Sequence, residues 1–363
     1  MKRPLHILFL ILLLLSQSFL PEGDKIRKPV DPVGFATKSW QMDQLMPRIN
    51  QKFNDKISEA WNKNNVANYS MWKTVICPHD DYTYASWLYP AILKNVKAKT
   101  VILIGVAHKA KNFNVEDKIV FDSYNGWAEP YGVVKISSLR EKITNNLPNS
   151  VFMIHDSLQQ AEHSLEAIVP FLQYYNKNVE IVPILVPYMS YDRINEIASS
   201  LAQAMVRVMQ ENDLMWSKDI AIVISTDAVH YGCEGWGDAN YAFFGCDSAG
   251  YKKAIAHEYK IIQNSLTGEI NKDKVIKFMG YTVQDTNYRN YKWTWCGRFS
   301  VPFGLLTTYY LAQNLRIGPI KGKLIGYTTS IDHDTIPVSD LKMGKTAPAC
   351  INHWVGYPAI GYK

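Results

Sequence analysis

Three short apolar segments, each followed at once by histidine or aspartate, constrain this sequence more than any other feature. Residues 74–77, 99–106 and 220–225 are mostly apolar and rich in β-branched side chains. Such runs are typical of strands that are buried on both faces of a sheet. Residues 179–186 form a fourth run, in which Pro183 indicates a bulge or a sheet edge.

Segments with helical spacing of apolar residues alternate with these strands. Helices are expected at residues 40–61, 85–94, 191–210, 239–266 and 301–315. The Asn125–Gly126 turn signal predicts a hairpin within residues 118–136. Strands that alternate with helices predict an α/β sandwich, with a mostly parallel or mixed central sheet and helices on both faces.

The N-terminus has the composition of a secretory signal peptide. Lys2 and Arg3 precede an apolar run at residues 5–15, and small polar residues follow it. The run is shorter than the roughly 20 apolar residues of a membrane-spanning helix. We expect a signal peptide at 1–18, a linker and N-terminal helix at 19–64, and one α/β domain at 65–363. The mature protein would then be periplasmic or secreted, with no membrane span.

Charge and composition exclude one class of partner. The formal net charge is +6, and the sequence has no basic block and no stripe of alternating basic and aromatic residues. Nucleic-acid binding is therefore not expected, and the ligand is a small molecule or a peptide.

The three strand-like runs end in polar residues that suit a functional site. His79 follows the first run, His108 the second, and Asp227 and His230 the third. Parallel strands bring their carboxyl ends to one edge of a sheet, where open α/β sheets bind their ligands. We expect these side chains to converge there, together with the polar cluster that contains Glu162 and His163.

The five cysteines include one candidate for this site. Cys296 precedes Gly297 and a helix that begins near Ser300, and amide groups at a helix N-terminus favour a thiolate. An exported chain meets oxidising conditions, in which disulfides persist. If Cys296 is the unpaired cysteine, Cys233 and Cys246 are close enough in sequence to form a bridge.

Two chemistries suit this set of residues. In the first, His79, His108 and Cys296 bind a catalytic metal and leave positions open. Asp227 or Glu162 then orients a ligand, and His230 or His163 moves protons. In the second chemistry, Cys296 is a nucleophile activated by a histidine that Asp227 orients.

Thiolate and imidazole ligands also suit zinc, so a zinc hydrolase is a variant of the metal hypothesis. A third alternative is a non-catalytic module that recognises a peptide or glycan through an aromatic surface. Four aromatic residues motivate it: Tyr288, Tyr291, Trp293 and Trp295.

Five motifs, in this order, resemble those of the Memo-like family. PHDDYTYA at 78–85 resembles a PHAGYTYS-like signature, and GVAH at 105–108 is similar to GPSH. The other three are EHSLEAIVPFL at 162–172, STDAVHYG at 225–232 and CGRFSVPFGLL at 296–306. They resemble EHSLE-x-x-LPFL, SSDLSHYG and CGRxPI-x-x-LL. The chain is thus identified as a member of the Memo-like family, which includes AmmeMemoRadiSam system protein B.

This resemblance implies a fold related to the class III extradiol dioxygenases, which are non-haem iron enzymes. It implies a metal held by His79, His108 and Cys296, with iron expected first and copper second, and Asp227 and His230 in the same pocket. A metal-dependent oxidoreductase follows as an expectation, without a substrate. In one departure from the family, Asp80 and Asp81 replace Ala-Gly after the first histidine, and we expect them in a solvated turn.

Overall fold

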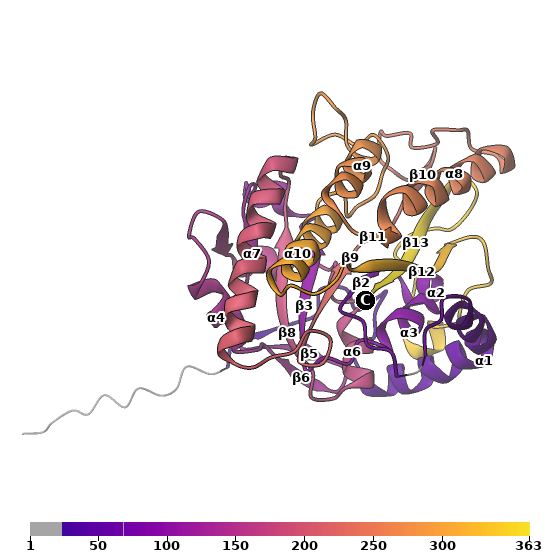
Figure 1. The fold of residues 1–363 in the computed structure, drawn as a ribbon. Coiled ribbons are helices and arrows are strands. Elements are labelled where there is room, and N and C mark those ends of the chain that lie inside the picture. The colour runs from indigo at the N-terminus through magenta and orange to yellow at the C-terminus, as the bar shows by residue number, and fades with distance from the viewer. Residues whose placement is uncertain (1–23, 68) are drawn as a thin grey trace, which may run out of the picture.

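The computed structural model describes residues 24–67 and 69–363. In that part of the chain, a ten-stranded mixed sheet has the order β11-β12-β13-β2-β9-β3-β8-β4-β7, with β10 paired to β13 (Figure 1). Its strands are β2 (Thr74–Cys77), β3 (Thr100–Val106), β4 (Ile119–Phe121), β7 (Phe152–Ile154), β8 (Glu180–Val186), β9 (Ile220–Ser225), β10 (His230–Gly232), β11 (Gly268–Glu269), β12 (Lys321–Thr329) and β13 (His353–Tyr362). Strands β2, β9, β3 and β8 are parallel, as the apolar runs predicted.

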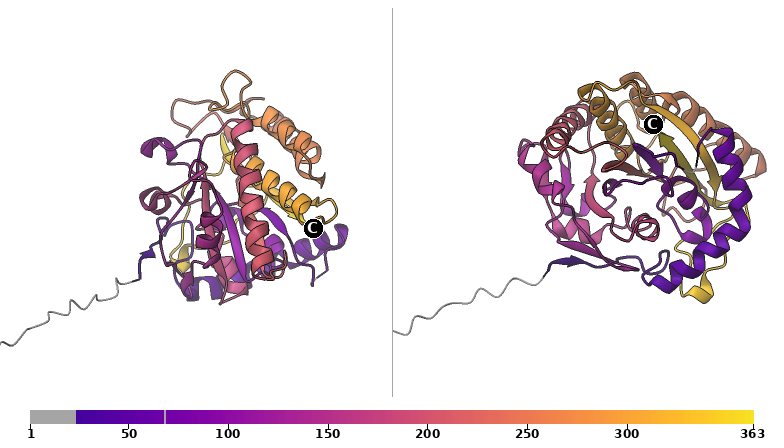
Figure 2. Two further views of the ribbon diagram at one scale, coloured as in Figure 1. Left: turned by 60° about the vertical axis from the view of Figure 1, so that its left-hand side comes forward. Right: turned by 60° about the horizontal axis from the view of Figure 1, so that its bottom comes forward.

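Helices cover both faces of this sheet (Figure 2). They are α1 (Ser39–Lys63), α2 (Tyr82–Ala85), α3 (Leu88–Leu93), α4 (Leu139–Asn145), α5 (Asp156–Ala161), α6 (Val169–Tyr175), α7 (Tyr191–Glu211), α8 (Ser248–Ile261), α9 (Lys272–Thr282) and α10 (Ser300–Asn314). Short 3₁₀ turns lie at Ala110–Phe113 and Ser339–Leu341, and α8 continues into a π-helical turn at Ile262–Leu266. The predicted α/β sandwich is confirmed.

Alternating side chains of the central strands build two separate cores. Ile102, Ile104, Ile222 and Ile224 point to the face covered by α7 and α10. Their neighbours in sequence, among them Leu103, point to the opposite face, which α1, α3 and α6 cover. Because the two-residue period of a strand sends adjacent side chains to opposite faces, an uninterrupted apolar run is needed to fill both cores.

The predicted hairpin around Asn125–Gly126 is wrong. The hairpin is formed by β5 (Gly126–Glu129) and β6 (Gly132–Lys135), and its turn lies between Glu129 and Gly132. Asn125 instead accepts a hydrogen bond at Oδ1 from the backbone N–H of Lys25 (2.8 Å). The turn signal was misleading because Asn125 pairs with a distant segment of the chain.

Two other boundaries differ from the sequence-based prediction. Residues 85–94 are divided between α2 and α3, and α8 starts at Ser248 rather than near residue 239. Asp247 caps α8 by accepting the Gly250 N–H (2.7 Å), so the helix cannot extend further towards the N-terminus. Pro183 lies inside β8, between β3 and β4, and not in an edge strand.

The part of the predicted linker that the structure describes is packed against the domain. β1 (Ile26–Arg27) pairs in parallel with β5, and Arg27 is 1% exposed. The Arg27 guanidinium binds the Glu166 carboxylate (2.6 Å) and the Gln159 carbonyl (2.9 Å). The signal-peptide prediction lies outside the described residues. No helix in residues 24–67 or 69–363 has the length and apolar character required to cross a membrane.

A disulfide joins Cys233 to Cys246, as their proximity in sequence suggested. Replacing both cysteines by serine is expected to lower the free energy of unfolding by about 3 kcal/mol, because the bridge restricts a loop of about 15 residues in the unfolded chain. Urea denaturation measures this loss. Cys350→Ser is the control, since Cys350 is an exposed free thiol. The double variant has no bridge to reduce. If a reductant lowers the stability of the wild type no more than that of the double variant, the expected loss is contradicted.

Candidate metal centre

The carboxyl ends of three adjacent parallel strands position the candidate site. β9 lies between β2 and β3 and pairs with both. His79, His108 and Asp227 each lie two residues beyond the end of their strand. This common offset places three polar side chains at one edge of the sheet, where open α/β sheets bind their ligands.

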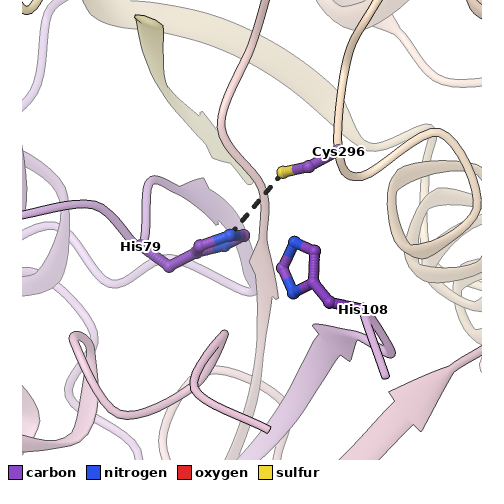
Figure 3. Close-up of side chains that lie close together, drawn as sticks. All are labelled: His79, His108 and Cys296. Atoms are coloured by element: carbon purple, nitrogen blue, oxygen red, sulfur yellow. Dashed lines mark hydrogen bonds between the residues drawn. The ribbon is translucent and has the colours of Figure 1, made fainter. Parts of the chain in front are cut away.

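The side chains of His79, His108 and Cys296 point toward one another (Figure 3). One possible ligand atom from each lies within 4.8 Å of the other two, and His79 Nε2 is 3.6 Å from Cys296 Sγ. The predicted convergence of distant imidazoles and one sulfur is confirmed. Two further groups meet the same 4.8 Å limit and share a member with the first: His108, Glu162 and His163; and Asp227, His230 and Cys296. All seven residues selected from the sequence therefore belong to one cluster.

His79 is held as a neutral imidazole with a defined tautomer. Its Nδ1 lies 2.7 Å from Ser225 Oγ, and the Ser225 hydroxyl donates to the Ser164 carbonyl (2.5 Å). Ser225 Oγ must therefore accept from Nδ1–H, which leaves a lone pair on Nε2 facing Cys296. Burial lowers the pKa of His79 well below its usual range, and the nearby His108 imidazole lowers it further.

His108 is oriented by Glu162. Its Nδ1 lies 2.8 Å from Glu162 Oε1, which also accepts the backbone N–H groups of His163 (2.9 Å) and Ser164 (3.0 Å). Burial alone would raise the pKa of Glu162, but the charge and hydrogen bond of His108 and the backbone donors lower the pKa to about 2. The ionised carboxylate fixes the proton on Nδ1 and frees Nε2, which is the usual arrangement behind a metal-bound histidine.

The Cys296 thiol carries a proton that a bound metal would have to displace. Its Sγ accepts the Asp227 N–H (3.1 Å) and lies 3.7 Å from Thr226 Oγ1. Burial raises the pKa of the Cys296 thiol well above its usual range, and the Asp227 carboxyl raises it further. The expectation that the nearby helix N-terminus favours a free thiolate is therefore wrong, because burial outweighs the N–H donor. Coordination to a metal deprotonates such a thiol.

The glycine after Cys296 is needed for close packing. A Cβ at Gly297 would lie 2.2 Å from Thr226 Oγ1, which accepts the Gly297 N–H (3.0 Å). Gly297→Ala is expected to lower the free energy of unfolding by about 1–3 kcal/mol through overpacking. Gly280→Ala is the matched control, since no atom lies within 4 Å of a Cβ there. Thermal unfolding compares the two, and equal stability of both variants would contradict the close approach.

Two further histidines face the centre without forming strong hydrogen bonds there. His163 stacks on His108, with ring centroids 4.9 Å apart. Burial, followed by the charge of His108, lowers the pKa of His163 to about 4 and that of His230 to about 3. The Nε2 atom of His230 is buried and has no hydrogen-bond partner. Both imidazoles are neutral near pH 7 and can accept a proton.

No sequence pattern indicated the residue that anchors the Cys296 segment. Glu258 in α8 accepts hydrogen bonds at Oε1 from the indole N–H groups of Trp293 (2.5 Å) and Trp295 (2.8 Å). Tyr327 and the Val229 N–H donate to its other oxygen (3.0 and 3.3 Å). Because Trp293 and Trp295 are 3% and 0% exposed, they cannot form the aromatic surface that the binding-module alternative requires.

A small cavity of about 90 Å³ opens beside two of the candidate ligands, His108 and Cys296. Its other walls include Tyr188, Tyr291 and Arg298. Aliphatic, aromatic and polar side chains all line it, so a bound molecule or a small part of one would contact the candidate ligands and a guanidinium together.

The donor set can hold a transition metal. The Nε2 atoms of His79 and His108 and the sulfur of Cys296 supply nitrogen and sulfur ligands, which suit iron, copper and zinc. Fold and site together define an α/β protein with an imidazole–thiol cluster at the carboxyl edge of its sheet.

Residues 44–343 match the Memo-like protein family, and the chain belongs to this family. A MEMO1 family protein of Aquifex aeolicus is 32% identical over 162 residues, which is 44% of this chain and 54% of the relative. The alignments to this and similar relatives thus span only about half of their length. A MEMO1 family protein of Nitrosopumilus maritimus is 26% identical over 345 residues, covering 93% of this chain and 99% of the relative.

Proposed function

We propose that this Memo-like protein binds one redox-active metal ion, iron first and copper second, through His79, His108 and Cys296, and that it is an exported metal-dependent oxidoreductase. The observation that carries the proposal is the convergence of these three donors within 4.8 Å. Hydrogen bonds donated by the Nδ1–H groups to Ser225 and Glu162 orient both imidazoles for binding. A bound ion would supply Lewis acidity and one-electron redox chemistry at this point.

The residues of the chain would perform the remaining tasks. Glu162 holds His108 in the orientation for binding, and Ser225 does the same for His79. His163 and His230 are weak bases because their pKa values are lowered, so they would accept a hydrogen bond from a substrate in the pocket and take up its proton only transiently. The apolar side of the cavity, including Phe299 and Val186, would exclude water from the substrate.

The geometry disfavours a cysteine nucleophile. In a Cys–His–Asp triad, the thiol and the carboxylate contact opposite nitrogens of the imidazole. Here Cys296 Sγ (3.6 Å) and Asp227 Oδ2 (3.5 Å) both face Nε2 of His79, while Ser225 occupies Nδ1. Burial also raises the pKa of the Cys296 thiol. Zinc remains chemically compatible with the ligands, so a zinc hydrolase is the alternative to test.

The disulfide supports the proposed export. Disulfides persist in the periplasm and outside the cell, and they are rare in the cytosol. The Cys233–Cys246 bridge suits such a compartment.

Metal analysis of the mature, untagged protein tests the proposal. The metal-free protein is incubated separately with Fe²⁺, Cu⁺ and Zn²⁺, desalted, and measured by elemental mass spectrometry. We expect about one ion of iron or copper per chain, as for a site with three protein ligands. Substoichiometric binding of all three metals would overturn the proposal, and retention of zinc alone would favour the hydrolase.

A further inference from the structure

The strongest unassigned feature of the molecule is a buried arginine at the wall of the small cavity. Arg298 is 4% exposed, and its Nε is buried without a hydrogen-bond partner. Its Nη2 donates to the Arg289 carbonyl (3.1 Å). No salt bridge to a carboxylate of the described residues involves Arg298, although a buried charge is costly unless it is paired.

A second buried arginine in the same chain shows what a structural arginine looks like here. Arg27 is 1% exposed and binds the Glu166 carboxylate (2.6 Å), and all three of its guanidinium nitrogens donate hydrogen bonds. Both arginines lie over an aromatic ring, Arg27 at 4.2 Å from Trp127 and Arg298 at 3.6 Å from Tyr291. The aromatic contact is therefore common to both, and Arg298 differs in lacking a carboxylate partner.

The cavity places this unpaired cation beside the candidate metal ligands. Arg298, His108 and Cys296 line the same space of about 90 Å³. Its remaining walls are largely aromatic and aliphatic, with Tyr188 and Phe299 among them. A cavity of this size with one guanidinium in its wall suits a small organic anion or the anionic end of a larger one.

A wider surface pocket shares one residue with this cavity. Tyr188 lines both the small cavity and an adjoining pocket of about 430 Å³, whose other residues include Lys111, Asn114 and Arg289. Arg289 is partly neutralised by Glu116 (2.5 Å), whereas Lys111 makes no salt bridge to a described residue. Tyr188 is therefore the residue at which a ligand larger than the small cavity would meet this second, cation-bearing pocket.

We propose that Arg298 binds an anionic group of the substrate, a carboxylate or a phosphate, and holds the rest of that substrate against the His108–Cys296 side of the cavity. The inference rests on the proposed function for the role of that cavity as a reaction site. Arg298 is buried without a carboxylate partner whether or not a metal is bound, so the anion site can be tested separately.

Anion binding by the mature protein with its disulfide intact provides the test. Propionate, its neutral isostere propionamide and inorganic phosphate are titrated by calorimetry into metal-free and metal-loaded protein. We expect propionate to bind and propionamide not to bind. Arg298→Gln should weaken propionate binding about 10- to 100-fold, since a charge-assisted pair is lost. Arg298→Lys, which keeps the charge but loses the planar fork, should give an intermediate loss.

Arg207→Gln is the matched control, because this arginine is exposed in α7 and lines neither the small cavity nor the wider pocket. Propionate affinity should be unchanged in that variant. Metal content is measured in parallel, and Arg298→Gln should retain the wild-type amount. Anion binding that persists in wild-type protein without any metal uptake would refute the proposed function and leave the anion site intact.

The two anion sources give different results. Tighter binding of phosphate than of propionate, lost in Arg298→Gln, would identify a phosphorylated ligand. No binding of either anion to the wild-type protein, or unchanged binding to Arg298→Gln, would overturn the inference. If Arg298→Gln does not fold, two measurements still test the inference. They are the comparison of propionate with propionamide on the wild type, and the propionate affinity of Arg298→Lys.

Discussion

Replacing Cys296 by serine is expected to reduce the bound metal from about one ion per chain to less than about a tenth, because the site loses its sulfur ligand. Loss of an outer hydrogen-bond partner of a metal ligand typically costs 10- to 100-fold in affinity, so loss of a ligand itself should cost more. His108→Ala should behave in the same way. Elemental mass spectrometry after desalting measures the bound metal.

The chain offers matched controls for both substitutions. Cys350 is an exposed free thiol, and His257 belongs to none of the metal-capable groups in the described residues. Cys350→Ser and His257→Ala should therefore retain full metal content. Because serine is nearly isosteric with cysteine, the metal-free Cys296→Ser protein should unfold at a temperature close to that of the wild type. Full metal occupancy in Cys296→Ser or His108→Ala would show that the ion binds elsewhere.

The strand ends could be predicted because their cause is local. Apolar runs such as residues 220–225 are removed from water when they form buried strands. Parallel pairing then brings the carboxyl ends of these strands together. His79, His108 and Asp227 follow those ends at the same distance, so their convergence needed no knowledge of side-chain packing. Cys296 follows no strand end and was selected from its place before a helix and from the short motif that surrounds it.

The supporting hydrogen bonds could not be predicted, because they join residues that are far apart in sequence. Ser225 was visible at the end of its strand, but its bond to His79 depends on the register of β2 against β9. Glu258 lies in the middle of a helix without any local signal, and its indole partners are 35 and 37 residues away. Long-range polar contacts of this kind follow from the complete fold and not from periodicity.

The predicted solvated turn at Asp80 and Asp81 is wrong for the same reason. Asp81 is 1% exposed and accepts from the Thr346 N–H (2.6 Å), and Asp80 accepts from Tyr357 (2.6 Å). Adjacent carboxylates in a loop are usually hydrated. Here segments more than 250 residues away supply the donors, so Asp81 is buried and Asp80 is half-buried.

Glu258→Ala is expected to lower the free energy of unfolding by about 3–5 kcal/mol, because it leaves buried donors without an acceptor and creates a cavity. The orphaned groups would be the Trp293 and Trp295 indoles, the Tyr327 hydroxyl and the Val229 N–H. Since Trp295 immediately precedes Cys296, the variant should also bind metal more weakly. Chemical denaturation measures the first effect, and Glu59→Ala, at an exposed position of α1, is the control.

The stability of the wild type relative to Glu258→Gln, measured over a range of pH, gives a second test of the Glu258 carboxyl. Burial raises the pKa of Glu258 to about 7, although four hydrogen-bond donors oppose the shift. The unfolded chain ionises this group near pH 4.5, so the folded state binds the proton more tightly between pH 4.5 and pH 7. The contribution of Glu258 to stability must therefore fall as the pH rises through this range and level off above about pH 7.

The stability of the wild type relative to Glu258→Gln should decrease by about 3 kcal/mol between pH 4.5 and pH 7. A difference that stays constant with pH would mean that the four donors keep Glu258 ionised, and its anchoring of the Cys296 segment would then be that of a buried charge.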